Sequence, residues 1–163
     1  MKGKSHRVLK SIALLTKQAT GSTIGFRANQ QVAVNLIGAD GLAADIGCVL
    51  IRKGVSMLRI YDPMQGVHGH HVLSSTSVYQ AIALTKHLAQ ETGNPQTKII
   101  GYPFRFDPVT AFPCDLAIVI NADNPLRTFC NNYFQAVKTP HLSVTLSPDG
   151  GRGTVIVHQA QAT

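Results

Sequence analysis

The feature of this sequence that most constrains its fold is a series of short apolar runs, each ending in a turn rich in glycine, aspartate or asparagine. Residues 32–37 form one such run and end at Gly38, and residues 115–120 form another and end at Asn121. Nearly continuous apolar strands are typical of a parallel sheet that is covered on both faces. We expect further strands at 56–61, 98–102, 141–146 and 154–158.

Helical patterns alternate with these runs. Residues 41–53, 78–89 and 126–137 place apolar side chains three and four residues apart, and Gly54 and Gly93 follow the first two segments. Apolar spacing of this kind, closed by glycine, is typical of amphipathic helices. Strands that alternate with such helices predict βαβ crossovers. We therefore predict an α/β fold: a three-layer, Rossmann-like, mostly parallel sheet with helices on both faces.

The length of 163 residues suits one main domain, and 44% apolar against 14% charged residues is a globular composition. No apolar run approaches the roughly 20 residues that a membrane span needs. We expect a basic helical segment at residues 1–27, with its helix at 7–19, and a nucleotide-binding domain at residues 28–163. The three cysteines form no C-x-x-C pair, which favours small buried side chains in a reducing compartment and hence a cytoplasmic protein.

The chain carries a formal charge of +7, partly because Glu91 is its only glutamate. A positive field favours anionic partners such as nucleotides, nucleic acid or an acidic protein. Six basic residues and no acid fall within residues 1–27. A nucleic-acid arm or a transit-like leader is compatible with that segment, but a solvated amphipathic helix is favoured.

Three turns are candidates for a ligand site, because ligands of such sheets bind beyond the carboxyl ends of the strands. They are residues 38–44, 62–77 and 121–127. The first begins Gly38-Ala39-Asp40-Gly41, so that Asp40 stands at the middle glycine of a G-x-G-x-x-G/A phosphate loop. A carboxylate there repels phosphate. Asp62, at the end of a strand, suits ribose hydroxyls, although these residues also fit an ordinary tight turn.

The third turn leaves two interpretations open. Asp123 could hold magnesium, since carboxylate oxygens are its preferred ligands, with Arg127 as a nearby cation. Asp123 and Asn124 could instead cap the following helix. The cluster His68 to His71 could bind zinc or copper, but no cysteine or carboxylate lies within a few residues. An incidental cluster is favoured, and no zinc site is predicted.

Taken together, these turns resemble the ThiF/MoeB/HesA family, which includes the adenylation domains of ubiquitin-activating enzymes. The resemblance runs from about residue 30 to 158. Its blocks are Gly38 to Ala44 against GAGGLGS, a strand ending in Asp62-Pro63, a helix ending in Asn94-Pro95, and Asp123-Asn124 with Arg127, Pro140 and the glycine-rich turn at 150–153.

The resemblance implies a domain that binds ATP and magnesium and adenylates the C-terminal glycine of a ubiquitin-like or sulfur-carrier protein. It also implies a homodimer or a heterodimer. Asp62 would contact the ribose, and Asp123 would be the magnesium-associated catalytic acid. The candidate site is therefore catalytic Asp123 and Arg127 with nucleotide-binding Gly38, Asp40, Gly41, Asp62 and Asn124.

The sequence departs from the family where charge matters most. Asp40 replaces a phosphate-loop glycine. The family's phosphate-binding arginine would fall within residues 70–75, which contain no arginine, and the lysine of its next helix would fall near Gln80. The resemblance is also short at its C-terminal end, where family members continue into zinc-binding C-x-x-C pairs. Losing one electrostatic donor costs on the order of 3 kcal/mol of transition-state stabilisation.

Three hypotheses follow. The favoured one is a degenerate nucleotide- or protein-binding module in a dimer. The second is an active minimal adenylating enzyme that uses substitute cations such as Arg7, Arg59, Lys86 or Arg105. The third is an NAD-dependent oxidoreductase, which Asp62 permits but which Asp40 and the missing substrate domain disfavour.

Overall fold

The structure is a computed structural model that describes residues 31–65, 79–147 and 152–159. The helix expected at 7–19, the cluster His68 to His71 and the turn at 148–151 lie outside the described residues, and the boundary between residues 27 and 28 stays a prediction. None of the described helices is long and apolar enough to cross a membrane. Cys48, Cys114 and Cys130 are free thiols.

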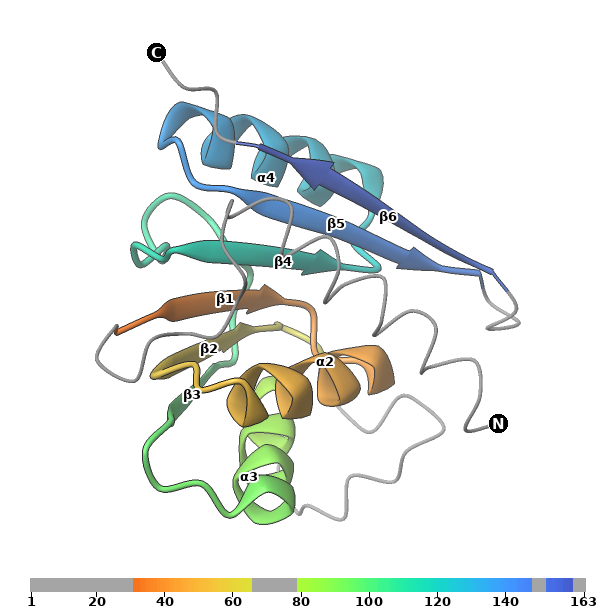
Figure 1. Cartoon of the computed structure of the whole chain (residues 1–163). Coiled ribbons are helices and arrows are strands. Elements are labelled where there is room, and N and C mark those ends of the chain that lie inside the picture. Colours follow the sequence, from red (N-terminus) through yellow and green to blue (C-terminus); the bar gives the residue numbers. More distant parts are fainter. Residues whose placement is uncertain (1–30, 66–78, 148–151, 160–163) are drawn as a thin grey trace.

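Six strands form one sheet (Figure 1). They are β1 (Ala33–Ile37), β2 (Met57–Tyr61), β3 (Lys98–Tyr102), β4 (Leu116–Ile120), β5 (His141–Leu146) and β6 (Gly153–His158). Their order is β3-β2-β1-β4-β5-β6, and every neighbouring pair is parallel except β5 with β6. The predicted mostly parallel sheet is confirmed. The strand order changes direction between β1 and β4, which makes their carboxyl ends the switch point of the sheet.

Three helices complete the layers: α2 (Gly41–Arg52), α3 (Gln80–Thr92) and α4 (Asn124–Ala136). Helices α2 and α3 pack on one face of the sheet and α4 on the other, as Figure 1 shows. The three-layer α/β fold is therefore confirmed. The helices begin and end where the sequence provides caps: Asp40 precedes α2, Asp123 precedes α4 with Pro125 in its first turn, and Gly93 follows α3.

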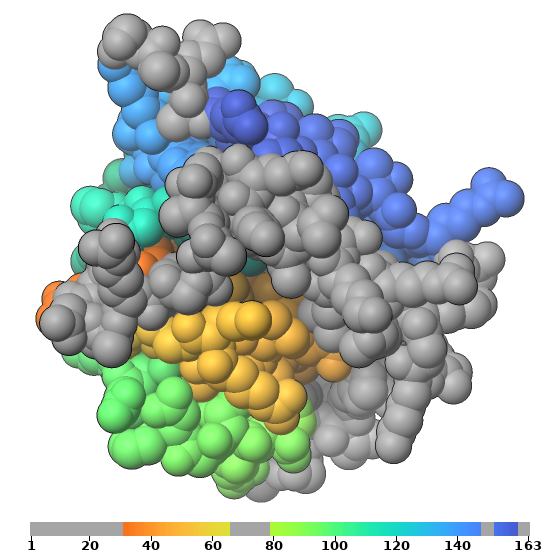
Figure 2. Space-filling view, in the orientation of Figure 1, coloured from red at the N-terminus to blue at the C-terminus, as the bar shows by residue number. Residues whose placement is uncertain are grey.

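Two apolar clusters fill the space between the layers, because successive side chains of a strand point to opposite faces. Leu36 of β1 and Ile60 of β2 pack beneath α2 and α3, whereas the adjacent Ile37 and Tyr61 pack on the α4 side. All five residues of β4 are buried, since both of its faces are covered. Figure 2 shows the outer surfaces of α2 (orange) and α3 (green) next to one another in the lower part of the view.

The connection between β3 and β4 covers part of the face that α4 leaves open. It has no helix or strand, and its core is Phe106, whose ring centroid lies 5.1 Å from that of Tyr61 and 5.3 Å from that of Phe134. Arg59 of β2 fixes its far end by donating to the Pro113 carbonyl at 2.8 Å. An aromatic loop therefore stands where a helix would otherwise pack.

Candidate functional site

The candidate site is the switch point, where the ends of β1 and β4 meet. Gly38 ends β1 with φ of 111°, and a Cβ atom there would lie 2.7 Å from the backbone oxygen of Ile120. Both the backbone conformation and the close approach therefore require glycine. This contact brings the turn that begins at Gly38 against the turn that begins at Asn121.

Asp40 joins these two turns. One carboxylate oxygen, Oδ1, accepts a hydrogen bond from the backbone N–H of Ala43 at 3.1 Å and caps α2. The other, Oδ2, accepts from the side-chain amide of Asn121. The N-terminus of a helix is where a phosphate would receive backbone N–H donors and the positive end of the helix dipole. In this chain a carboxylate already occupies that position.

Asn121 extends the link to a third strand. Its Oδ1 accepts a hydrogen bond from the backbone N–H of Leu146 at 2.7 Å, and its backbone lies in the left-handed region with φ of 47°, which asparagine tolerates. Sequence reasoning counted Asn121 among the polar residues of its turn but did not identify this role. The contact depends on the strand order, which no local pattern reports.

Asp62 lies beneath the first turn and is 8% exposed. Its Oδ2 accepts from the N–H of Ala39 at 2.8 Å and its Oδ1 from the N–H of Met64 at 2.7 Å. Burial raises the pKa of Asp62; the two N–H groups oppose that rise, and the charge of Asp40 adds to it. Asp62 therefore holds the backbone of the Gly38 turn, and this leaves fewer acceptor positions for a ribose hydroxyl.

Asp123 caps α4, as one of the two sequence interpretations proposed. Its Oδ1 accepts from the N–H of Leu126 at 2.8 Å. The same oxygen lies 3.7 Å from Nη2 of Arg105, and both side chains are more than half exposed. An exposed ion pair at this distance contributes little stability. The magnesium role of Asp123 stays a prediction.

The two other candidates on this turn lie on α4. Arg127 donates from Nη2 to the carbonyl of Ala122 at 2.9 Å, and this holds the turn against its own helix. Asn124 is exposed in the first turn of α4. The structure thus brings Gly38, Asp40 and Gly41 together in one turn that Asp62 holds through Ala39, and it places Asp123, Asn124 and Arg127 on the adjoining turn.

Gln80 occupies the start of α3, near the position that the family resemblance gives to a lysine. It is 5% exposed, and its buried Nε2 has no hydrogen-bond partner among the residues that the structure describes. Tyr79, the N-cap residue, makes no side-chain capping bond. Buried donors are nearly always paired, so an unpaired amide at a helix N-terminus is suited to an acceptor on a ligand. Gln80 supplies a donor there, but no charge.

The charges of the described site are mainly negative. Asp40, Asp62 and Asp123 lie on its three turns, and the described cations that contact these turns are Arg105 and Arg127. Within residues 31–65, 79–147 and 152–159, no group of three or more His, Cys, Asp or Glu side chains is arranged to hold a metal ion. The donor set of the described residues therefore fits a triphosphate poorly.

Comparison with known proteins supports the fold. No protein-family model and no curated protein matches the sequence. Solved structures of E. coli MccB do match. With AMPCPP and MccA, the TM-score is 0.64 at 15% identity over 90% of this chain and 43% of that chain. With ATP, the TM-score is 0.59 at 16% identity over 82% and 39%. The chain thus spans less than half of MccB. The likeness is one of fold.

Proposed function

We propose that this chain is a divergent ThiF-type domain that works as a nucleotide- or protein-binding module without adenylation activity, as one subunit of a cytoplasmic homodimer or heterodimer. The observation that carries the proposal is the carboxylate of Asp40, which caps α2 and binds Asn121 at the switch point. In this proposal the fold of a nucleotide-binding site is kept, but the positively charged residues that an adenylating enzyme needs are replaced by other residues.

The size of the electrostatic effect supports a loss of activity. Two unit negative charges about 4 Å apart repel by about 4 kcal/mol at an effective dielectric constant near 20. A phosphate at the N-terminus of α2 would meet Asp40 at such a distance. Gln80 adds an uncharged donor where the resemblance implies a lysine. Each missing donor costs on the order of 3 kcal/mol in the transition state, so the two effects together remove useful turnover.

The comparison supports a nucleotide and a protein partner as the ligand classes. MccB has been crystallised with ATP and with MccA, and this chain shares its fold. By analogy, we propose that any ligand of this chain is a nucleotide in the crevice at Gly38, Asp40 and Asp62, a ubiquitin-like or sulfur-carrier protein above it, or both. Magnesium would approach Asp123.

An active adenylating enzyme is the second candidate, and the contact between Arg105 and Asp123 favours it, since it places a cation at the predicted catalytic acid. ATP–pyrophosphate exchange with a ubiquitin-like protein that ends in Gly-Gly separates the two. The binding-module proposal predicts that neither the wild type nor an Arg105→Ala variant gives exchange above that of a sample without protein. Exchange that depends on Arg105 would establish the enzyme and contradict the proposal.

Thermal shifts with AMP, ATP and NAD test the ligand class. A module with a retained nucleoside site is stabilised by AMP at least as well as by ATP, because AMP brings fewer phosphates to Asp40. If none of the three nucleotides shifts the melting temperature, the proposed function is reduced to protein binding alone. Stabilisation by NAD and not by AMP or ATP would support an oxidoreductase and contradict the proposal.

A further inference from the structure

The outer edge of β3 is an unpaired strand edge in the described sheet. Lys98 donates its backbone N–H to Ser56, and the Tyr102 carbonyl accepts from Asp62, so both residues face the β2 side. Because backbone groups alternate along a strand, Ile99 and Gly101 direct their N–H and C=O groups outward. No other described strand pairs with them. Such an edge is a template for another strand.

The side chains of this edge strand do little to block pairing. Natural edges are protected by charged side chains, especially lysine, by proline or by bulges. Lys98 is the only charged residue of β3, and the strand contains no proline. At the opposite end of the sheet (Figure 1), the outer strand β6 carries the polar side chains Thr154 and His158.

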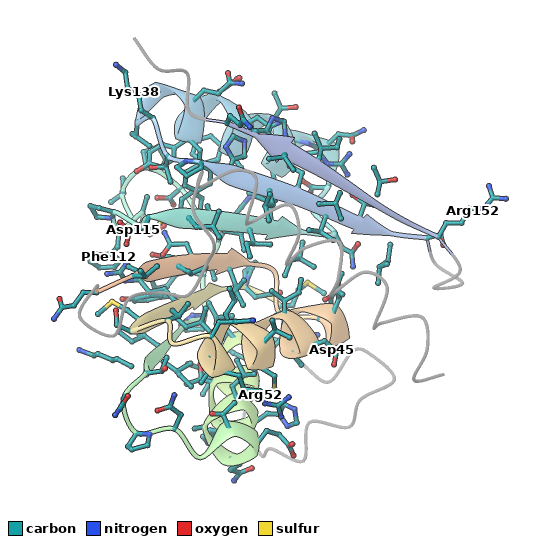
Figure 3. All side chains as sticks on the ribbon, viewed as in Figure 1. Asp45, Arg52, Phe112, Asp115, Lys138 and Arg152 are labelled. Carbon is teal, nitrogen blue, oxygen red and sulfur yellow. The ribbon has the colours of Figure 1, made fainter. Side chains whose placement is uncertain are left out.

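An apolar patch adjoins β3 on the α4 side of the sheet. The ring of Tyr102 lies 5.4 Å from that of Phe104 and 5.4 Å from that of Phe112, which are 38% and 46% exposed. Arg59 lies against Phe112, with its guanidinium carbon 5.4 Å from the ring centroid. Figure 3 shows Phe112 at the edge of the sheet where the strands begin, away from the crevice.

The loop that carries this patch is held in one conformation. Oδ1 of Asp107 accepts from the N–H groups of Val109 and Thr110 at 2.8 and 2.9 Å, and Val109 is 95% exposed. Preorganised apolar groups bind with a smaller entropic cost. The patch and the free edge together form a surface suited to a protein partner.

We propose that this partner is a second copy of the chain, whose β3 pairs antiparallel with β3 about a two-fold axis at Ile100. This inference rests on the dimer in the proposed function and specifies its surface. The register follows from the outward-facing backbone groups: Ile99 forms a hydrogen-bonded pair with Gly101 of the second copy, and Ile100 faces Ile100 of the second copy. The two sheets become one.

The register also makes the strand self-complementary in charge. It sets Lys98 opposite Tyr102 of the second copy in a non-hydrogen-bonded pair, where side chains lie closest. An ammonium beside an aromatic ring is attracted to it. No two lysines meet. In a two-fold interface every contact occurs twice, so the interface contains two Lys98–Tyr102 pairs.

The test is disulfide trapping with Ile100→Cys. Non-hydrogen-bonded pairs have Cα atoms about 4.5 Å apart, within the range that a disulfide spans. We expect oxidation of this variant to give a covalent dimer, and we expect the wild type, with its three native cysteines, to stay uncrosslinked under the same conditions. Ile156→Cys on β6 is the matched control, since Ile156 is also a partly exposed strand isoleucine. Equal crosslinking of both variants would overturn the proposal.

Sedimentation of the wild type supplies the second measurement, which does not depend on how a variant folds. We expect a reversible dimer at micromolar concentrations and a monomer for Ile100→Asp, which sets two carboxylates against each other at the axis. If the wild type is a monomer, or if Ile100→Asp leaves the dimer intact, the proposed β3 interface is wrong. Thermal shifts of the same samples with nucleotides measure ligand binding in the crevice. The absence of a dimer and the absence of nucleotide binding can therefore be told apart.

Discussion

At the residue scale, two histidines that stack inside the structure link its stability to pH. His141 of β5 and His158 of β6 are register partners whose ring centroids lie 4.3 Å apart with an interplanar angle of 3°. His141 is 1% exposed; its Nε2 lies 3.1 Å from Oδ1 of Asn131, and its Nδ1 lies 3.4 Å from the carbonyl of Thr139. Burial and then the charge of His158 lower the pKa of His141 to about 4. Burial also lowers the pKa of His158.

This pair predicts a loss of stability in mild acid. The unfolded chain takes up protons near pH 6.5, whereas folded His141 takes one up only near pH 4. Between these values the unfolded state binds more protons, so the free energy of unfolding falls as the pH falls, by about 3 kcal/mol for His141. Urea unfolding across this range measures the slope. His158→Phe keeps a stacked ring without its charge and should make the slope shallower.

His87→Gln is the control for that experiment, because His87 lies on α3, on the other face of the sheet. Its slope should equal that of the wild type. A free energy of unfolding that does not change between pH 6.5 and 4 would contradict the role given to the pair.

The candidate site could be predicted from the sequence only in part, and individual residues show why. The conflict between Asp40 and a phosphate follows from its position in a known turn. The bond between Asp40 and Asn121 joins residues 81 positions apart and exists only because β1 and β4 are neighbours. The contact between His141 and His158 could not be predicted either. It depends on the register between β5 and β6, and the sequence of the turn between them does not fix that register.

At the element scale, the packing of α3 on β3 depends on a residue without a side chain. A Cβ atom at Gly101 would lie 2.6 Å from the backbone oxygen of Ala81 and 2.7 Å from Oγ1 of Thr85. Because the first of these atoms belongs to the helix backbone, it cannot move without moving α3. The close approach of the helix therefore requires glycine at this position of the strand.

Gly101→Ala should lower the free energy of unfolding by about 1–3 kcal/mol, the usual cost of overpacking. Gly47→Ala is the comparison. Its Cβ would also approach to 2.7 Å, but the neighbour is Cδ1 of Leu88, at the end of a flexible side chain. Alanine also favours the helix by about 1 kcal/mol over glycine. Urea denaturation of both variants should show the larger loss for Gly101→Ala, and the reverse order would contradict this account.

Most elements could be predicted from the sequence because each carries its own signal. Apolar runs identified the strands, Gly93 marked the end of α3, and Asp123 was one candidate cap for α4, whereas the cap that Asp40 gives α2 emerged only from the structure. The course of the β3–β4 connection could not be predicted, because its aromatic side chains pack against Tyr61 and Phe134, which come from distant parts of the chain.

At the scale of the whole molecule, the proposed function combines a nucleotide-binding type of fold with a site that Asp40 alters. The sheet places the carboxyl ends of β1 and β4 side by side, as a nucleotide-binding sheet does. The hydrogen bonds of Asp40 then close the N-terminus of α2 to phosphate, and those of Asp62 hold the turn above it. In the proposed function, the bonds that hold these turns are also the ones that weaken nucleotide binding.

Calorimetric titration of ATP into the wild type and Asp40→Gly tests this claim most directly. Asp45→Asn is the control, since Asp45 also lies on α2 (Figure 3) and its loss changes the net charge equally. The account predicts that Asp40→Gly binds ATP about tenfold more tightly or better, a gain of about 1.4 kcal/mol, and that Asp45→Asn does not. Unchanged or weaker ATP binding by a folded Asp40→Gly would contradict it.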